Sequence, residues 1–177
     1  MNKNSIEKKR IYLDNAAATP IRREVLEAMM PFLTEDFGNP SSIHGEGVRA
    51  RRAVDEARSS VARTLEIKPQ GVIFTGNGTE SNNLAILGHI KYLHKKGLAY
   101  ADMEVVTTKI EHPSILGVMD ELSDLGVQVK FVEVDERGII TIPALEAVLL
   151  PKTVMVTFAY ANSEVGTVQP VLRLVRR

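Results

Sequence analysis

The first candidate binding segment of this sequence is FTGNGTESNN, residues 74–83. A helix beginning near Thr79 would present unpaired backbone N–H groups at its positive end, and Gly76 and Gly78 would let an anion approach closely. The hydroxyls of Thr79 and Ser81 would add two hydrogen-bond donors. The simpler interpretation is a tight turn in which Thr79 caps the helix, and the spacing alone slightly favours it.

Two named phosphate motifs fit this segment incompletely. A P-loop requires Gly-Lys followed by Ser or Thr, and the segment contains no lysine. The dinucleotide fingerprint G-x-G-x-x-G is matched by Gly76 and Gly78, but Ser81 stands at its third glycine. The next acidic residue that could bind a ribose, Asp102, lies too far along the chain. A nucleotide site therefore remains an alternative with partial support.

Two further segments carry polar side chains that suit a ligand. In TKIEHPSI (residues 108–115), His112 directly precedes a proline. Its imidazole could stack on a flat ligand or exchange a proton near neutral pH, or could simply hydrogen-bond the next helix. Asn162 and Ser163, in YANSEVGTVQP (residues 160–170), could bind a ligand hydroxyl or carboxylate, although this segment could equally form a turn. Together, the segments suit a flat, phosphorylated cofactor.

The elements that must position these segments alternate between helical and extended patterns. Strands are predicted over residues 71–75, 104–108, 127–134 and 153–160. A helix is predicted to begin at Pro20 with Thr19 as its cap, and three others are predicted over residues 81–96, over residues 113–126 and from Pro143. A further long helix is predicted to be capped by Ser41 or Ser42. Its buried face would carry Val54, Ala57, Val61 and Leu65. Strands separated by helices imply a largely parallel sheet covered on both faces, an α/β fold that binds ligands beyond the carboxyl ends of its strands.

The composition narrows the functional class. The 177 residues, 44% of them apolar, suit one domain with a real core, and 22 basic residues balance 22 acidic ones. We therefore expect a small-molecule ligand, with neither nucleic acid nor a membrane as partner. No apolar run could cross a bilayer and no signal peptide is recognisable, which predicts a cytoplasmic protein. Cysteine is absent and the histidines do not pair at metal-binding spacing, so no metal site is expected.

The sequence contains five motifs in a fixed order: IYLDNAAATP, FGNPSSIHGEG, VIFTGNGTESNNLAI, TTKIEHPSI and ANSEVGTVQPV. They resemble the N-terminal half of cysteine desulfurases, the fold type I pyridoxal-phosphate enzymes of the class V aminotransferase group. The resemblance runs from about Ile11 to about Val171. It implies an N-terminal arm over residues 1–20 and an incomplete transferase large domain over residues 21–177. The implied reaction removes sulfur from cysteine for iron-sulfur cluster or thio-cofactor assembly.

The resemblance also implies roles for particular residues. In that family the loop matching Gly78 and Thr79 holds the cofactor phosphate, and the histidine matching His112 stacks on the pyridine ring. Asn162 and Ser163 match an Asn-Asn pair whose second member contacts the ring hydroxyl. Because serine is shorter, that contact would become water-mediated or be lost. The family normally has Ser-Gly-Ala-Thr where this chain has Gly-Asn-Gly-Thr.

The resemblance leaves part of the family's catalytic machinery without a match. Family members are about twice this length, and their Schiff-base lysine and catalytic cysteine lie beyond the point where this chain stops. Lys109 and Lys152 do not occur in the expected motif, and the final VLRLVRR begins a helix without a cap.

We therefore expect a truncated desulfurase that is inactive alone. It would act as a homodimer or with a complementing C-terminal half, and a sulfur-acceptor protein would be a further partner. A non-catalytic cofactor-binding or scaffold relative and a nucleotide-binding α/β domain are the alternatives.

Overall fold

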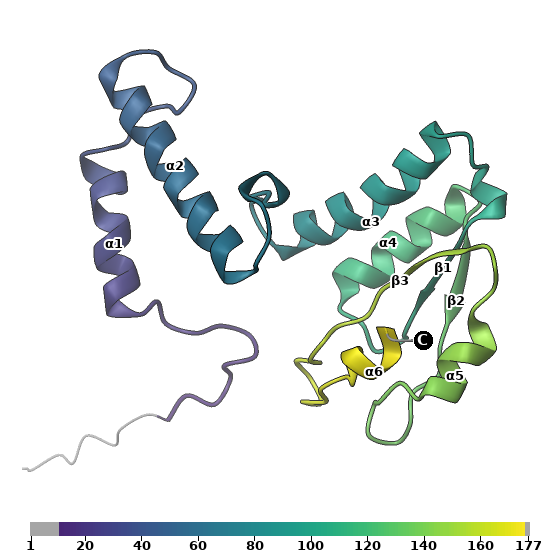
Figure 1. Cartoon of the computed structure of the whole chain (residues 1–177). Helices are drawn as coiled ribbons and strands as arrows, with labels where there is room; N and C mark the ends of the chain where they lie inside the picture. The colour runs from purple at the N-terminus through teal and green to yellow at the C-terminus, as the bar shows by residue number, and fades with distance from the viewer. Residues whose placement is uncertain (1–10, 176–177) are drawn as a thin grey trace, which may run out of the picture. The chain divides into compact units, whose positions relative to one another are not determined.

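The computed structural model describes residues 11–175 (Figure 1). The chain divides into two compact units, Met1–Phe74 and Thr75–Arg177. The residues predicted to bind a ligand all lie in the second unit. Among residues 11–175, no helix combines the length and the apolar character needed to cross a membrane.

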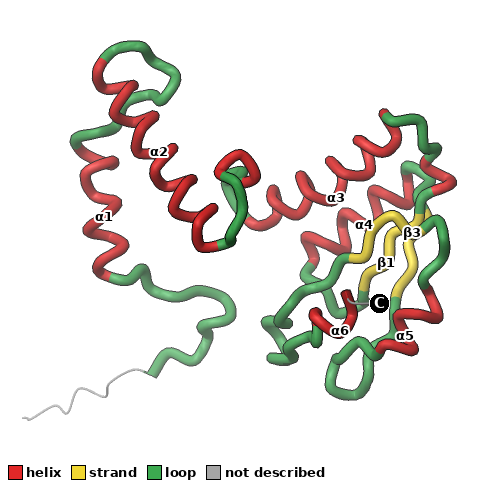
Figure 2. The backbone as a smooth tube through the Cα atoms, in the orientation of Figure 1, coloured by secondary structure: helices red, strands yellow, loops and turns green. Residues whose placement is uncertain are grey.

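The second unit is built on a parallel sheet of three strands, in the order β2-β1-β3. The strands are yellow in Figure 2. The strands are β1 (Glu104–Thr107), β2 (Gln128–Phe131) and β3 (Thr153–Val156). Parallel strands need crossover connections, and α4 (Pro113–Asp124) and α5 (Ile142–Val148) lie in those connections. The predicted α/β class is confirmed.

The central strand β1 organises two core clusters, because successive strand residues point to opposite faces of a sheet. Val105 packs on one face with residues of α3 (Gly78–Lys95) and α4. Val106 packs on the other face with residues of α5 and α6 (Val171–Val175). The first cluster also contains Ile86, Ile90, Ile115, Val118, Met119 and Leu122, and the second contains Val132, Ile140, Leu145 and Leu174. Helices therefore cover both faces of the sheet.

Glycines end the two helices of the first cluster as the sequence predicts. Gly97 follows α3 with φ +103°, and Gly126 follows α4 with φ +92°, a left-handed conformation that costs glycine little. The helix predicted over residues 81–96 begins earlier, because Asn77 caps it and Gly78 is its first residue. The predicted final helix is present as α6, while residues 176–177 lie outside the described part.

The first unit contains α1 (Arg23–Thr34), α2 (Gly45–Thr64) and a short 3-10 helix, Pro69–Gly71. The prediction that α1 begins at Pro20 with Thr19 as its cap is wrong. The residue before the helix is Arg22, whose side chain makes no capping hydrogen bond.

The cap of α2 is His44, and the prediction of Ser41 or Ser42 is wrong. The Nδ1 atom of His44 accepts a hydrogen bond from the Gly47 backbone N–H at 3.4 Å. The preceding turn packs directly on the helix, because a Cβ added to Gly47 would lie 2.4 Å from the carbonyl oxygen of Ser42. Glycine is therefore needed where the turn meets the helix.

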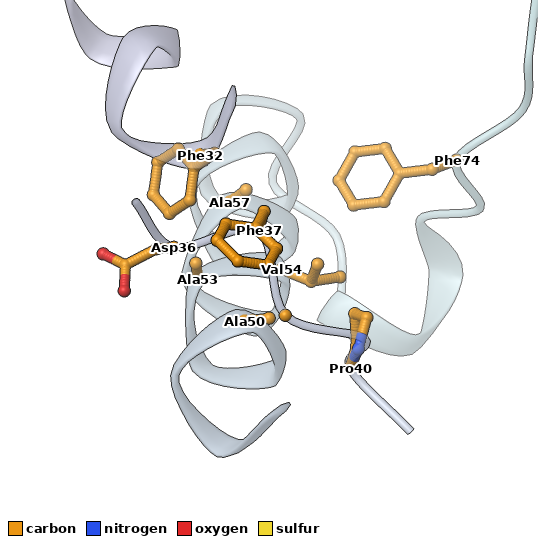
Figure 3. Close-up of a pocket in the computed structure, with 10 residues that line it drawn as sticks. Phe32, Asp36, Phe37, Pro40, Ala50, Ala53, Val54, Ala57 and Phe74 are labelled. Atoms are coloured by element: carbon orange, nitrogen blue, oxygen red, sulfur yellow. The ribbon is translucent and has the colours of Figure 1, made fainter. Parts of the chain in front are cut away.

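The predicted buried face of α2 remains largely open in this structure, with Val61 39% and Leu65 60% exposed. Val54 and Ala57 line a pocket of about 380 Å³. In Figure 3 the rings of Phe32, Phe37 and Phe74 surround these α2 side chains. The buried residues of the helix are instead Gly47, Ala50 and Ala62.

The strand predicted over residues 71–75 is absent. Ile73 is 68% exposed and Phe74 is 50% exposed. A strand is defined by pairing, and no segment within residues 11–175 hydrogen-bonds to this stretch as a neighbouring strand.

Candidate functional site

The N-terminus of α3 carries two open hydrogen-bond donors. The Oδ1 atom of Asn77 accepts from the Glu80 N–H at 2.9 Å, and its carbonyl oxygen accepts from the Ser81 N–H at 3.1 Å. The first N–H groups of a helix have no partner within it. Within residues 11–175, those of Gly78 and Thr79 therefore have no partner and could bind an anion at the positive helix end. The simpler interpretation, in which Thr79 is the cap, is wrong.

Gly78 is not required by the fold. Its φ is not positive, and an added Cβ would meet nothing within 4 Å. The residue is exposed, as is Thr79, whose hydroxyl makes no hydrogen bond within residues 11–175. Open space beside two unused N–H groups and a free hydroxyl fits a phosphate.

Two side chains of this segment are already engaged. The Ser81 hydroxyl lies 2.6 Å from that of Thr75 and donates to the Asn77 carbonyl at 3.2 Å, so it is not the free donor that the sequence suggested. The Oε2 atom of Glu80 accepts from the Gly76 N–H at 2.6 Å, so this carboxylate lies against the turn just before the cap residue Asn77. A bound phosphate would share this helix end with the Glu80 carboxylate.

His112 caps α4, as the simpler interpretation of its motif predicts. Its Nδ1 atom accepts from the Ser114 N–H at 3.1 Å and lies 2.8 Å from the Ser114 hydroxyl. The residue is exposed, and its Nε2 atom makes no hydrogen bond within residues 11–175. Capping and ligand contact are therefore compatible in one histidine.

A hydrogen bond between helices joins the first two predicted segments. The Nδ2 atom of Asn82 donates to the Ser114 hydroxyl oxygen at 2.8 Å, across 32 positions of sequence. Asn82 lies one turn after Gly78 and Thr79, on the same face of α3. The helix end that suits an anion and the His112 motif are thus held in one structural unit.

The third segment is tied to the His112 motif through Asn162. Its Nδ2 atom donates to the Ile110 carbonyl at 2.8 Å, while its Oδ1 atom accepts from the N–H groups of Glu164 and Val165 at 2.8 and 3.0 Å. Asn162 therefore shapes the turn, and one amide hydrogen remains for a ligand. Ser163 is exposed and its side chain forms no hydrogen bond within the described residues.

A buried carboxylate makes a second tie between the same loops. One oxygen of Glu111 accepts from the Thr108 hydroxyl at 2.7 Å, and the other accepts from the Ala159 N–H at 2.9 Å. Sequence reasoning missed Glu111, Asn82 and Ser114. All three lie inside the quoted motifs, within two positions of Ser81 or His112, and this position in the sequence could have indicated them.

Comparison with known proteins assigns the chain to a family. The sequence profile described as aminotransferase class-V matches residues 11–177. The chain belongs to the aminotransferase class-V family. Within the family it is 42% identical over 167 residues to "Cysteine desulfurase IscS" of Dictyoglomus turgidum and 42% identical over 164 residues to "Putative cysteine desulfurase IscS 1" of Bacillus subtilis. These alignments cover 94% and 92% of this chain but 41% of each relative.

Solved structures of the family show the same similarity. A "NifS-like protein" superposes with a TM-score of 0.86 at 40% identity, covering 94% of this chain and 44% of that one. The structure described as "SspA in complex with cysteine" superposes with a TM-score of 0.84 at 34% identity, covering 93% and 46%. The chain thus spans less than half the length of these family members. This membership argues against the alternative that the chain is a nucleotide-binding α/β domain.

Proposed function

We propose that this chain provides the part of a pyridoxal-phosphate site that binds the phosphate and contacts the ring, in a cysteine desulfurase. One observation carries the proposal: the Asn82–Ser114–His112 chain of hydrogen bonds joins an exposed imidazole to a helix end with unused donors. The similarity to proteins named cysteine desulfurases supports this choice of cofactor and reaction.

The residues divide the work of binding. The N–H groups of Gly78 and Thr79 and the Thr79 hydroxyl would hold the phosphate, while His112 would lie on the pyridine ring. Asn162 would support the ring from the third loop, and Ser163 would reach the ring hydroxyl directly or through water. When bound, the cofactor supplies the electron sink for bond cleavage in the amino-acid substrate.

The sulfur-transfer step would need groups that this sequence does not contain. No cysteine occurs among the 177 residues, so no thiolate of this chain can accept sulfur. The resemblance places the Schiff-base lysine and that cysteine in the part of the relatives that this chain does not match. We propose that a complementing C-terminal half completes the site, with homodimerisation and a sulfur-acceptor protein as further features of the working enzyme.

Cofactor retention tests the proposal. The protein is incubated with pyridoxal phosphate or with pyridoxal and dialysed, and the remaining cofactor absorbance is measured. We expect the phosphorylated compound to be retained more strongly than pyridoxal. Thr79→Val should weaken its binding by about tenfold to a hundredfold, the effect of one hydrogen bond to a charged group. His112→Ala should weaken binding of both compounds, whereas His89→Ala, at an exposed position later in α3, should change neither.

Equal retention of the two compounds would mean that the protein does not bind the phosphate group. No effect of either site variant would mean that the phosphate binds elsewhere.

A second candidate function, a non-catalytic cofactor-binding relative, is favoured by Ser163 where the family has asparagine. Mixing the protein with the C-terminal part of a full-length family member, cysteine and the cofactor separates the two functions. Sulfide release indicates a desulfurase part, and cofactor binding without sulfide release indicates the non-catalytic relative.

A further inference from the structure

The hydrogen-bond network at His112 has a fixed direction. The Ser114 backbone N–H can only donate, and it points at the His112 Nδ1 atom at 3.1 Å. That nitrogen therefore carries a lone pair and not a hydrogen. The Ser114 hydroxyl lies 2.8 Å from the same nitrogen, so it also donates to it.

Asn82 completes this direction from the neighbouring helix. Its amide nitrogen donates to the Ser114 hydroxyl oxygen at 2.8 Å, in a half-buried position. An amide N–H cannot accept a hydrogen bond, so the serine hydrogen has the imidazole as its partner. Each donor in this series of hydrogen bonds thus has one acceptor, and the series ends at the His112 ring.

We infer that Asn82 and Ser114 are positioning residues that hold His112 as the neutral tautomer with its hydrogen on Nε2. The inference rests on the proposed function for its consequence. In a pyridoxal-phosphate site, this arrangement presents a neutral ring face to the cofactor and a hydrogen-bond donor at a fixed atom. Because Asn82 follows the phosphate-binding turn on the same helix, one side chain would connect ring orientation to the phosphate end of the site.

The tautomer can be measured in the free protein by NMR. In the 177-residue chain labelled with ¹⁵N, correlations from the ring carbon-bound hydrogens to the ring nitrogens are recorded at about pH 8, where ordinary histidines are neutral. His112→Gln assigns the signals among the four histidines. We expect the Nδ1 atom of His112 to resonate as an unprotonated nitrogen and Nε2 as a protonated one.

Reversing the polarity of the network tests the role of Asn82. Asn82→Asp replaces the donor with an acceptor of the same shape, which turns the serine hydrogen away from His112. The tautomer ratio should then shift toward the Nδ1–H form by about threefold to tenfold, the effect of one hydrogen bond. Asn83→Asp is the matched control, because it adds the same charge one residue later, where the amide bonds the Thr79 carbonyl.

The serine provides an independent test. Ser114→Ala should shift the tautomer ratio in the same direction, and Ser114→Thr, which keeps the hydroxyl, should restore it. A wild-type His112 protonated on Nδ1 would overturn the inference, as would the same His112 tautomer ratio in folded Asn82→Asp and Asn83→Asp proteins. These measurements need no cofactor. Their failure is therefore distinguishable from a failure of cofactor retention, which would contradict the proposed function alone.

Discussion

Replacing Asn162 with alanine removes three hydrogen bonds, one to the Ile110 carbonyl and two from the N–H groups of Glu164 and Val165. Each contributes about 0.5–1.5 kcal/mol net. Glu164 and Val165 are exposed, so their N–H groups can bind water instead, and the half-buried bond to Ile110 is the main loss. We expect Asn162→Ala to lower the free energy of unfolding of the Thr75–Arg177 unit by about 1–2 kcal/mol.

Urea denaturation of the full chain, with amide hydrogen exchange in the loop, measures this effect. Asn162→Asp sharpens the test, because it keeps the acceptor but sets a carboxylate oxygen against the Ile110 carbonyl oxygen. Its loss should equal or exceed that of alanine. Ser163→Ala is the control, since that side chain makes no hydrogen bond within residues 11–175. If Asn162→Ala and Ser163→Ala unfold at the same urea concentration, the proposed tie between the loops is not stabilising.

Three further predictions concern the turn at α2, a pH-sensitive loop and Ser163, which stands where the family has asparagine. Gly47→Ala should destabilise the first unit by about 1–3 kcal/mol, because its Cβ would lie 2.4 Å from a carbonyl oxygen, whereas Gly88→Ala meets nothing within 4 Å and should stabilise α3 in thermal melts. The Ile139 backbone N–H lowers the pKa of Asp135, so this carboxylate contributes stability above the ordinary pKa and loses it as pH falls below about 4. The protection of the Ile139 amide, its exchange rate relative to that of an unfolded peptide at the same pH, should therefore fall in acid, and Asp135→Asn should remove that dependence. Ser163→Asn, which restores the family residue, should tighten pyridoxal-phosphate binding about threefold to tenfold in a titration, and weaker binding would contradict the ring contact.

The elements that the sequence predicted best are those whose partners lie nearby in the chain. The strand β1 and the helix α4 follow from a buried Val-Val pair, a proline start and the left-handed Gly126. The strand predicted over residues 153–160 is observed only as β3, because the Thr157 N–H is the last to donate to β1, at the Val106 carbonyl, and the backbone then turns to other partners. The Ala159 N–H, for example, donates to the buried Glu111 carboxylate. Such a side-chain partner, 48 positions away, leaves no periodic signal.

The candidate site was predicted at the level of segments, and the ties between the segments were not. The position of His112 directly before a helix-opening proline predicts a bond to the next helix, and the structure confirms that His112 caps α4. The link through Asn82 and Ser114 joins two helices across 32 residues, so only the packing of α3 on α4 reveals it. The cap of α3 is Asn77 and not Thr79, and the sequence does not decide between them because both residue types can cap a helix.

The central claim is that this chain binds the phosphate and the ring of one cofactor within its second unit. The most direct test is to map chemical-shift changes in the ¹⁵N-labelled protein while pyridoxal phosphate is added. The account predicts that the amides of Gly78 and Thr79 and the ring of His112 shift together, with one binding constant. Shifts confined to other residues, such as Phe37 and Val54 in the pocket of the first unit, would contradict it, as would no shift at saturating cofactor.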